Sequence, residues 1–190
     1  MVKIVKQNLN LICLKNKKSK RICKYKCKDN THEILFDDIE SRITELILQT
    51  RTCYISCIVP YVTNKAIMNA LSEKSGTRMI TNLGPHIKSN IRNKQLSRLK
   101  KWDDSEKSVI KTLSRGTGRN KTIIHSKIII GYNKDKSPLW VTNGSWNATE
   151  NSKNNIENMV VYTNQFFIAA FCHEFECLWE ASRHFNIKIP

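Results

Sequence analysis

The most restrictive feature of this sequence is an isoleucine-rich run, "TIIHSKIII" at residues 122–130, which carries a histidine and a lysine two positions apart. The β-branched residues on both sides predict a strand over 122–131 rather than a flexible loop. Because side chains alternate between the faces of a strand, we expect His125 and Lys127 on one face, about 6 to 7 Å apart. Two groups that can both be cationic repel each other unless an anion lies between or above them. The run therefore predicts an anion-binding pair on a sheet, and a phosphate is the natural anion.

Short apolar runs and amphipathic segments alternate along the chain. Helices are expected over 37–50, over 63–76 with Thr63 or Asn64 as its cap and Gly76 at its end, roughly over 92–102, and from Asn164 onward. Further strands are expected at 53–59, 77–83, 109–113, 139–143 and 157–162. Strands and helices alternate at first, and the later strands pair as a hairpin. This order predicts an α/β fold with one mixed sheet covered by helices on both faces.

The apolar stripes of these helices can be read from their spacing. The predicted stripe residues are Ile39, Ile43, Leu46 and Ile47 in the first helix, Ile67, Ala70 and Leu71 in the second, and Phe167, Ala170, Phe171, Phe175, Leu178 and Trp179 in the last. We expect one domain over 31–190, preceded by a basic arm or small appendage at 1–30.

The positive charge is concentrated in two segments. The chain has 32 Lys and Arg against 16 Asp and Glu, a formal net charge of +16. Residues 1–30 contain ten Lys or Arg and one acidic residue, and residues 84–121 contain eleven and three, so the remainder is close to neutral. A near-neutral body with two basic stretches is typical of nucleic-acid binders, although a solvated lysine-rich surface or tail has the same composition.

Cysteine usage and hydropathy bear on location and metal binding. Seven cysteines form no disulfide framework, and neither a signal peptide nor an apolar run of about 20 residues is visible, so we expect an intracellular protein without stable membrane insertion. A Cys3His zinc site and ordinary free thiols are both compatible with Cys13, Cys23, Cys27 and His32. Two further pairs, Cys53 with Cys57 and His173 with Cys177, are interpreted as core and as packing or surface positions.

A second cluster, "NGSWN" at residues 143–147, follows the histidine-lysine run. Gly144 lets the backbone approach a ligand, and Ser145 and Asn147 supply short hydrogen-bonding side chains. Glu157 could orient an imidazole and stabilise its cationic form. Trp146 either stacks on a base or packs in the core.

Taken together, "HSK", "GSWN" and "NNIENMVVY" resemble the phospholipase D superfamily, whose motif runs His-x-Lys, then Asp, then Gly-Ser-x-Asn, with a glutamate on the following strand. The resemblance covers about residues 35–183 and includes the small single-motif, nuclease-like and Zucchini-like members. It assigns catalytic positions to His125, Lys127, Ser145, Asn147 and Glu157. The family aspartate corresponds to Tyr132 here, and the nearest acid is Asp135; we interpret the change as structural, with a weakened or inactive enzyme as the alternative.

The resemblance implies phosphodiester cleavage through a phosphohistidine. Since this chain has one motif, it would form a homodimer in which each protomer supplies one half of the site. No cofactor or metal is implied, because two lysines would hold the phosphate. Arg115, Arg119 and Lys121 precede the motif strand and are expected to bind backbone phosphates, which favours a DNA or RNA substrate. The alternatives are a lipid phosphodiesterase and a nonhydrolytic nucleic-acid-binding protein.

Overall fold

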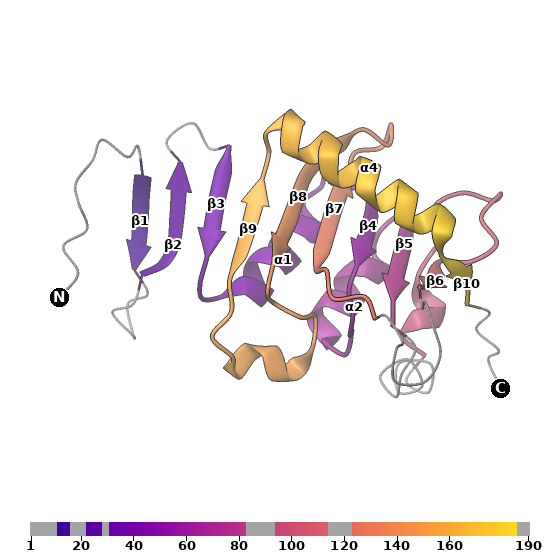
Figure 1. The fold of residues 1–190 in the computed structure, drawn as a ribbon, viewed down its shortest axis with the longest axis horizontal. Helices are drawn as coiled ribbons and strands as arrows, with labels where there is room; N and C mark the ends of the chain where they lie inside the picture. The colour runs from indigo at the N-terminus through magenta and orange to yellow at the C-terminus, as the bar shows by residue number, and fades with distance from the viewer. Residues whose placement is uncertain (1–10, 16–21, 28–30, 83–93, 114–122, 186–190) are drawn as a thin grey trace.

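The computed structural model describes residues 11–15, 22–27, 31–82, 94–113 and 123–185. One ten-stranded sheet, in the order β1-β2-β3-β9-β8-β7-β4-β5-β6-β10, organises these residues (Figure 1). Its strands are β1 (Leu11–Lys15), β2 (Ile22–Cys27), β3 (His32–Leu35), β4 (Tyr54–Ile58), β5 (Gly76–Thr81), β6 (Ile110–Thr112), β7 (Ile128–Tyr132), β8 (Pro138–Gly144), β9 (Met159–Tyr162) and β10 (Arg183–His184). The pairs β4–β5 and β5–β6 are parallel and the others are antiparallel, which confirms the predicted mixed sheet.

Helices cover both faces of the sheet. Helices α1 (Ile39–Leu48) and α2 (Lys65–Ser72) lie behind it in Figure 1, and α4 (Gln165–Ala181) crosses its front. The two faces have separate cores because neighbouring residues of a strand point to opposite sides. Ile129 packs with the α1 and α2 residues, whereas Ile128 and Ile130 pack with Phe175 and Trp179 of α4. The α/β fold with two helical layers is thus confirmed.

The first two helices follow the predicted patterns closely. In α1 the buried residues are Ile39, Ile43, Leu46 and Ile47, and in α2 they include Ile67, Ala70 and Leu71. Asn64 caps α2, since its side chain accepts a hydrogen bond of 3.0 Å from the backbone N–H of Ile67. The expected role of Gly76 was wrong. Helix α2 ends at Ser72, and Gly76 begins β5, where a Cβ atom would lie 2.7 Å from the backbone of Lys101 and Trp102.

Three other elements differ from the prediction. Strand β7 begins at Ile128 rather than at residue 122, and the described part of 92–102 contains a short 3-10 helix, η1 (Leu96–Arg98), instead of an α-helix. In α4 the buried stripe runs through Ile168, Phe175 and Trp179, while the predicted stripe residues Phe167 and Ala170 are exposed. The start of α4 is apolar on nearly every side, so contact with the sheet, and not the helical period, selects the buried face.

The first 30 residues are partly incorporated in the sheet. Strands β1 and β2 form an antiparallel pair, and β2 pairs with β3. Residues 11–15 and 22–27 of the expected basic arm therefore extend one edge of the main sheet (Figure 1).

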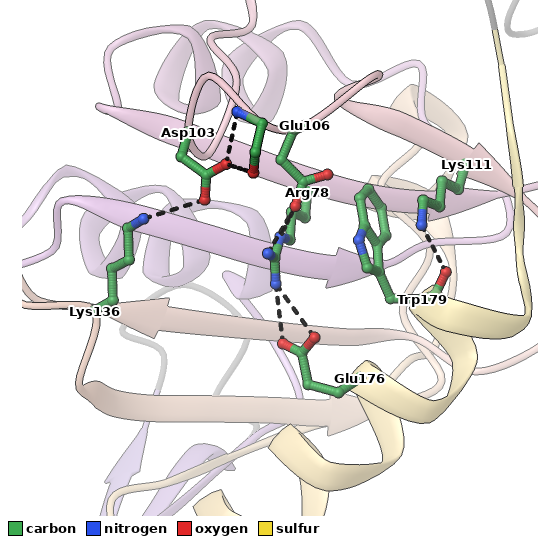
Figure 2. A network of polar contacts seen from close by, with 8 residues as sticks. Arg78, Asp103, Glu106, Lys111, Lys136, Glu176 and Trp179 are labelled. Atoms are coloured by element: carbon green, nitrogen blue, oxygen red, sulfur yellow. Dashed lines mark hydrogen bonds and ion pairs between the residues drawn. The ribbon is translucent and has the colours of Figure 1, made fainter.

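An arginine-centred cluster fastens α4 to the sheet (Figure 2). Arg78 of β5 donates to Glu106 at 2.8 Å and to Glu176 of α4 at 3.1 and 3.2 Å. Its guanidinium also lies over the rings of Trp102 and Trp179, at 4.8 and 5.6 Å from their centroids. Because the guanidinium is largely desolvated and doubly paired, this cluster contributes more than an ordinary surface ion pair.

We expect Arg78→Met to lower the free energy of unfolding by about 2 kcal/mol or more, because Glu106 would lose its guanidinium partner in a largely buried setting. Urea denaturation measures the change. Arg98→Met is the matched control, since Arg98 is exposed and its change is expected to stay within about 0.5 kcal/mol. Equal losses in the two variants would contradict the role assigned to Arg78.

Candidate active site

Sheet register brings the predicted motif residues to a single edge. Ile58 at the end of β4 pairs with Ile128 at the start of β7, and Ile128 pairs with Asn143 near the end of β8. Gly144 then pairs with Met159 at the start of β9. The segments that precede β7 and β9 and follow β8 must therefore meet at this edge. They carry His125, Lys127, Ser145, Asn147 and Glu157.

His125 and Lys127 lie close together in an irregular segment that leads into β7. Lys127 Nζ is 3.4 Å from His125 Nδ1 and donates a hydrogen bond to the carbonyl oxygen of His125. His125 is exposed, whereas Lys127 is 4% exposed. The prediction that the two groups share one side holds, but the strand alternation used to reach it was wrong, because the backbone at 123–127 is not a strand.

Within the described residues, the ammonium of Lys127 has no carboxylate in direct contact. The ion pairs of the described residues do not include Lys127, and burial lowers the pKa of Lys127, while the charge of Glu157 opposes that shift. Burying a cation without a counter-charge costs free energy. An anion held beside His125 would compensate this charge.

Glu157 is fixed by its neighbours in the second cluster. Ser145 Oγ donates to the Glu157 carboxylate and accepts from the backbone N–H of Asn158 at 3.0 Å. The Asn155 side chain donates to the other carboxylate oxygen of Glu157 at 3.2 Å. Among the described residues Glu157 has no hydrogen bond to His125, so its predicted contact with an imidazole stays a prediction for the assembled site. Within one chain, Glu157 acts on Lys127 through its charge.

The remaining residues of "GSWN" have separable roles. A Cβ atom on Gly144 would overlap the backbone oxygen of Asn158 and lie 2.8 Å from Met159 Cα, so the glycine is required where β8 approaches β9. Trp146 is 3% exposed and belongs to the α1/α2 core, which favours packing over stacking on a base. The side-chain oxygen of Asn147 is buried and has no hydrogen-bond partner in the described part of the chain. This oxygen is an acceptor, so only the amide nitrogen of Asn147 could donate to a phosphate oxygen.

Tyr132 occupies the interior where the motif has an aspartate. It is 6% exposed, its ring packs edge-on against Trp102 with centroids 4.9 Å apart, and its hydroxyl lies 3.8 Å from Cys172 Sγ of α4. Burial raises the pKa of Tyr132, so the phenol is neutral. Its contacts make it a packing residue beneath α4, in agreement with the structural interpretation of this substitution.

Other candidate residues lie apart from this edge or outside the description. Arg115, Arg119 and Lys121 are outside the described residues, as are the side chains of Cys13, Cys23 and Cys27. The zinc hypothesis for those cysteines and His32 is untested, and the described residues contain no group of three or more potential metal ligands.

The interpretation of Cys53 and Cys57 as core positions holds for one of them. Cys57 is buried in β4, whereas Cys53 precedes β4 and is half-buried. His173 and Cys177 are exposed on α4, with Nε2 and Sγ 3.8 Å apart.

Sequence reasoning missed one residue, Asn82, which follows β5 directly. Its side chain forms two hydrogen bonds with the backbone of Ile124, beside His125. Strand β4 separates β5 from the motif strand β7 in the sheet, and the available signal was only a polar residue at the end of a strand.

Comparison with known families identifies the chain. Residues 43–179 match the family described as "Cardiolipin synthase, PLD-like domain", where PLD denotes phospholipase D. The chain belongs to the phospholipase D-like family. The match spans both motif clusters and both helical layers, in agreement with the resemblance found in the sequence.

Individual relatives are distant. The uncharacterized protein L381 of Acanthamoeba polyphaga mimivirus is 24% identical over 195 residues, covering 84% of this chain and 69% of L381. NucT from Helicobacter pylori superposes with a TM-score of 0.59 at 18% identity, covering 81% of this chain and 98% of NucT. Nuc, a phospholipase D family member from Salmonella typhimurium, gives 0.57 at 17% identity, covering 82% and 99%. These two structures support the phospholipase D-like fold.

Within the described residues, no helix is both long and apolar enough to cross a bilayer.

Proposed function

We propose that this phospholipase D-like protein is a metal-independent phosphodiesterase that cleaves DNA or RNA at a site completed by a second copy of the chain. The proposal rests on the buried ammonium of Lys127, which has no contacting carboxylate among the described residues and lies 3.4 Å from the imidazole of the exposed His125. A phosphodiester suits this pair because it supplies the missing negative charge and an electrophilic phosphorus atom.

The chemistry takes two displacements. In the first, an imidazole nitrogen of one His125 attacks phosphorus while the P–O bond to the leaving group breaks, and the His125 of the second copy gives its proton to the leaving oxygen. In the second, that neutral imidazole takes a proton from water, the oxygen of which attacks phosphorus as the P–N bond breaks. Lys127 and Asn147 would stabilise the charge on the nonbridging oxygens during both steps.

A second copy is proposed because each chain supplies one histidine motif and the mechanism uses two. Exposed apolar side chains at the same edge support this assembly. Ile123 is 51% exposed and lies two residues before His125, Ile156 is 85% exposed and precedes Glu157, and Tyr61 after β4 is 42% exposed. A second protomer would cover these side chains as it brings its own motif to the site.

Charge favours a nucleic-acid substrate. The net charge of +16, concentrated near the two basic segments, suits a polyanion whose phosphates are bound without reading of sequence. A lipid phosphodiesterase is the second candidate, because the family description names cardiolipin synthase and the exposed Ile123, Ile156 and Tyr61 could also contact a membrane surface.

The distinguishing experiment presents substrates of both classes in EDTA. Single- and double-stranded DNA and RNA, and vesicles containing phosphatidylglycerol or cardiolipin, are each incubated with the protein. We expect cleavage of nucleic acid that weakens as salt rises. Release of lipid head groups without nucleic-acid cleavage would favour the second candidate, and tight nucleic-acid binding without any cleavage would favour a nonhydrolytic binding protein.

A further inference from the structure

The side chain of Asn82 pairs with the backbone next to His125. Asn82 follows β5 and is 7% exposed. Its Nδ2 donates to the carbonyl oxygen of Ile124 at 2.9 Å, and its Oδ1 accepts from the N–H of Ile124 at 2.9 Å. The amide thus satisfies both backbone groups of one residue, as a neighbouring strand would do.

This pairing matters because the segment before β7 lies outside the sheet ladder. The register between β4 and β7 ends at Ile58 and Ile128, so strand pairing does not extend to residues 123–127. In the described part of the chain, the hydrogen bonds that join this segment to a remote residue are the two between the Asn82 amide and Ile124, whereas the bond from the Lys127 ammonium to the His125 carbonyl lies within the segment. Asn82 is therefore the anchor on the N-terminal side of His125.

We infer that Asn82 is a positioning residue, which holds the backbone of Ile124 so that His125 is in line with the substrate phosphorus. The inference rests on the proposed function. Within the described residues, the Asn82 side chain forms no hydrogen bond with the imidazole or the ammonium; it acts through Ile124, whose side chain is buried in the core shared with Ile128 and Ile130. A nucleophile on an irregular segment needs such support, because a displacement of about 1 Å can lower the rate a hundredfold.

Asn82→Ala is expected to lower kcat about a hundredfold while KM changes by less than about threefold, since substrate contacts are kept and orientation of the nucleophile is lost. Single-turnover cleavage, normalised to the folded fraction measured by circular dichroism, provides the values. An unchanged kcat per folded molecule would overturn the inference.

The Asn82→Asp variant tests whether Asn82 acts as an anchor. A purely structural role predicts that its cleavage rate relative to wild type is independent of pH. The aspartate keeps the shape of asparagine but, when ionised, it offers no donor to the Ile124 carbonyl. Burial raises the pKa of such a carboxyl group, and its protonated form regains the donor. The rate of this variant, relative to wild type at the same pH, is therefore expected to rise at least about tenfold as pH falls from 8 to 5. A ratio that is independent of pH would contradict the anchoring role.

Ser108→Ala serves as the control for general destabilisation. Ser108 is also buried and pairs with backbone groups, its hydroxyl donating to the Ile110 carbonyl at 2.7 Å, but it precedes the start of β6, whereas Asn82 follows the end of the parallel strand β5. Its kcat should equal that of wild type.

Hydrogen exchange separates this inference from the proposed function. The amide of Ile124 should exchange at least about tenfold faster in Asn82→Ala than in wild type and Ser108→Ala, whether or not a substrate is cleaved. If the wild type cleaves none of the tested substrates, the proposed function fails. Unaltered exchange at Ile124 overturns the anchoring itself.

Discussion

Replacing His125 with alanine is expected to lower phosphodiester cleavage by at least about a thousandfold, because the proposed nucleophile and the proposed acid are both removed from a two-copy site. Substrate affinity should change much less, since Lys127, Asn147 and the basic segments are retained. Single-turnover cleavage and filter binding measure the two effects. His173→Ala is the matched control, as His173 is exposed on α4 and should leave the rate unchanged. If His125→Ala still cleaves the substrate, the proposed mechanism is wrong.

The same variant tests the two-copy site. If both histidines of a dimer are required, adding an equal amount of His125→Ala protein to a fixed amount of wild type, followed by subunit exchange, should reduce cleavage to about half, because mixed dimers are inactive. If each chain acts alone, the added variant changes nothing. Sedimentation of the mixture shows whether dimers are present. A fully active monomer would contradict the two-copy site, because no second chain would supply the second histidine.

Replacing Lys127 with methionine is expected to act in opposite directions on activity and stability. Cleavage should fall at least about a thousandfold, because the ammonium that stabilises the charge on the phosphate oxygens is lost. The free energy of unfolding should rise by about 1 kcal/mol at neutral pH, because an apolar side chain of similar length replaces a buried cation that has no contacting carboxylate in the described part of the chain. Cleavage assays and urea denaturation measure the two effects.

The pH dependence gives a further check on Lys127. Burial lowers its pKa in the folded state, so the folded protein binds fewer protons than the unfolded chain between the two pKa values. The free energy of unfolding of the wild type is therefore expected to rise with pH across that interval. This rise should be absent in Lys127→Met. Added phosphate should raise the Tm of wild type more than that of the variant, because the anion compensates the buried ammonium.

Lys111→Met is the matched control for activity. Lys111 is also buried, and desolvation also lowers its pKa, but its ammonium donates to the Trp179 carbonyl at 2.9 Å and lies 4.3 Å from the Trp179 ring centroid (Figure 2). It has protein partners and no place in the candidate site, so cleavage should be unaffected. An equal loss of cleavage in both lysine variants would show that general packing damage, and not the lost phosphate contact, is responsible.

The order of strands and helices was readable from the sequence because each helix or strand repeats its own local period. The stripes of α1 and α2 followed from residue spacing alone, and the alternation of side chains along β7 accounts for Ile129 and its two neighbours lying in different cores. The resemblance of "HSK" and "GSWN" to a known motif then singled out His125, Lys127, Ser145, Asn147 and Glu157 as candidates.

Tertiary structure decided what surrounds those candidates. The sequence suggested a strand at 123–127, but the structure has an irregular segment anchored by Asn82, which is 42 residues from Ile124 along the chain. Burial of Lys127 and Trp146, and the packing of Tyr132 beneath α4, likewise depend on contacts between distant segments. Local periodicity reports how a residue faces its own helix or strand. Local periodicity does not predict which remote side chain will bond to a backbone group or exclude water. Those remote contacts determine the charge and orientation of the groups at the sheet edge.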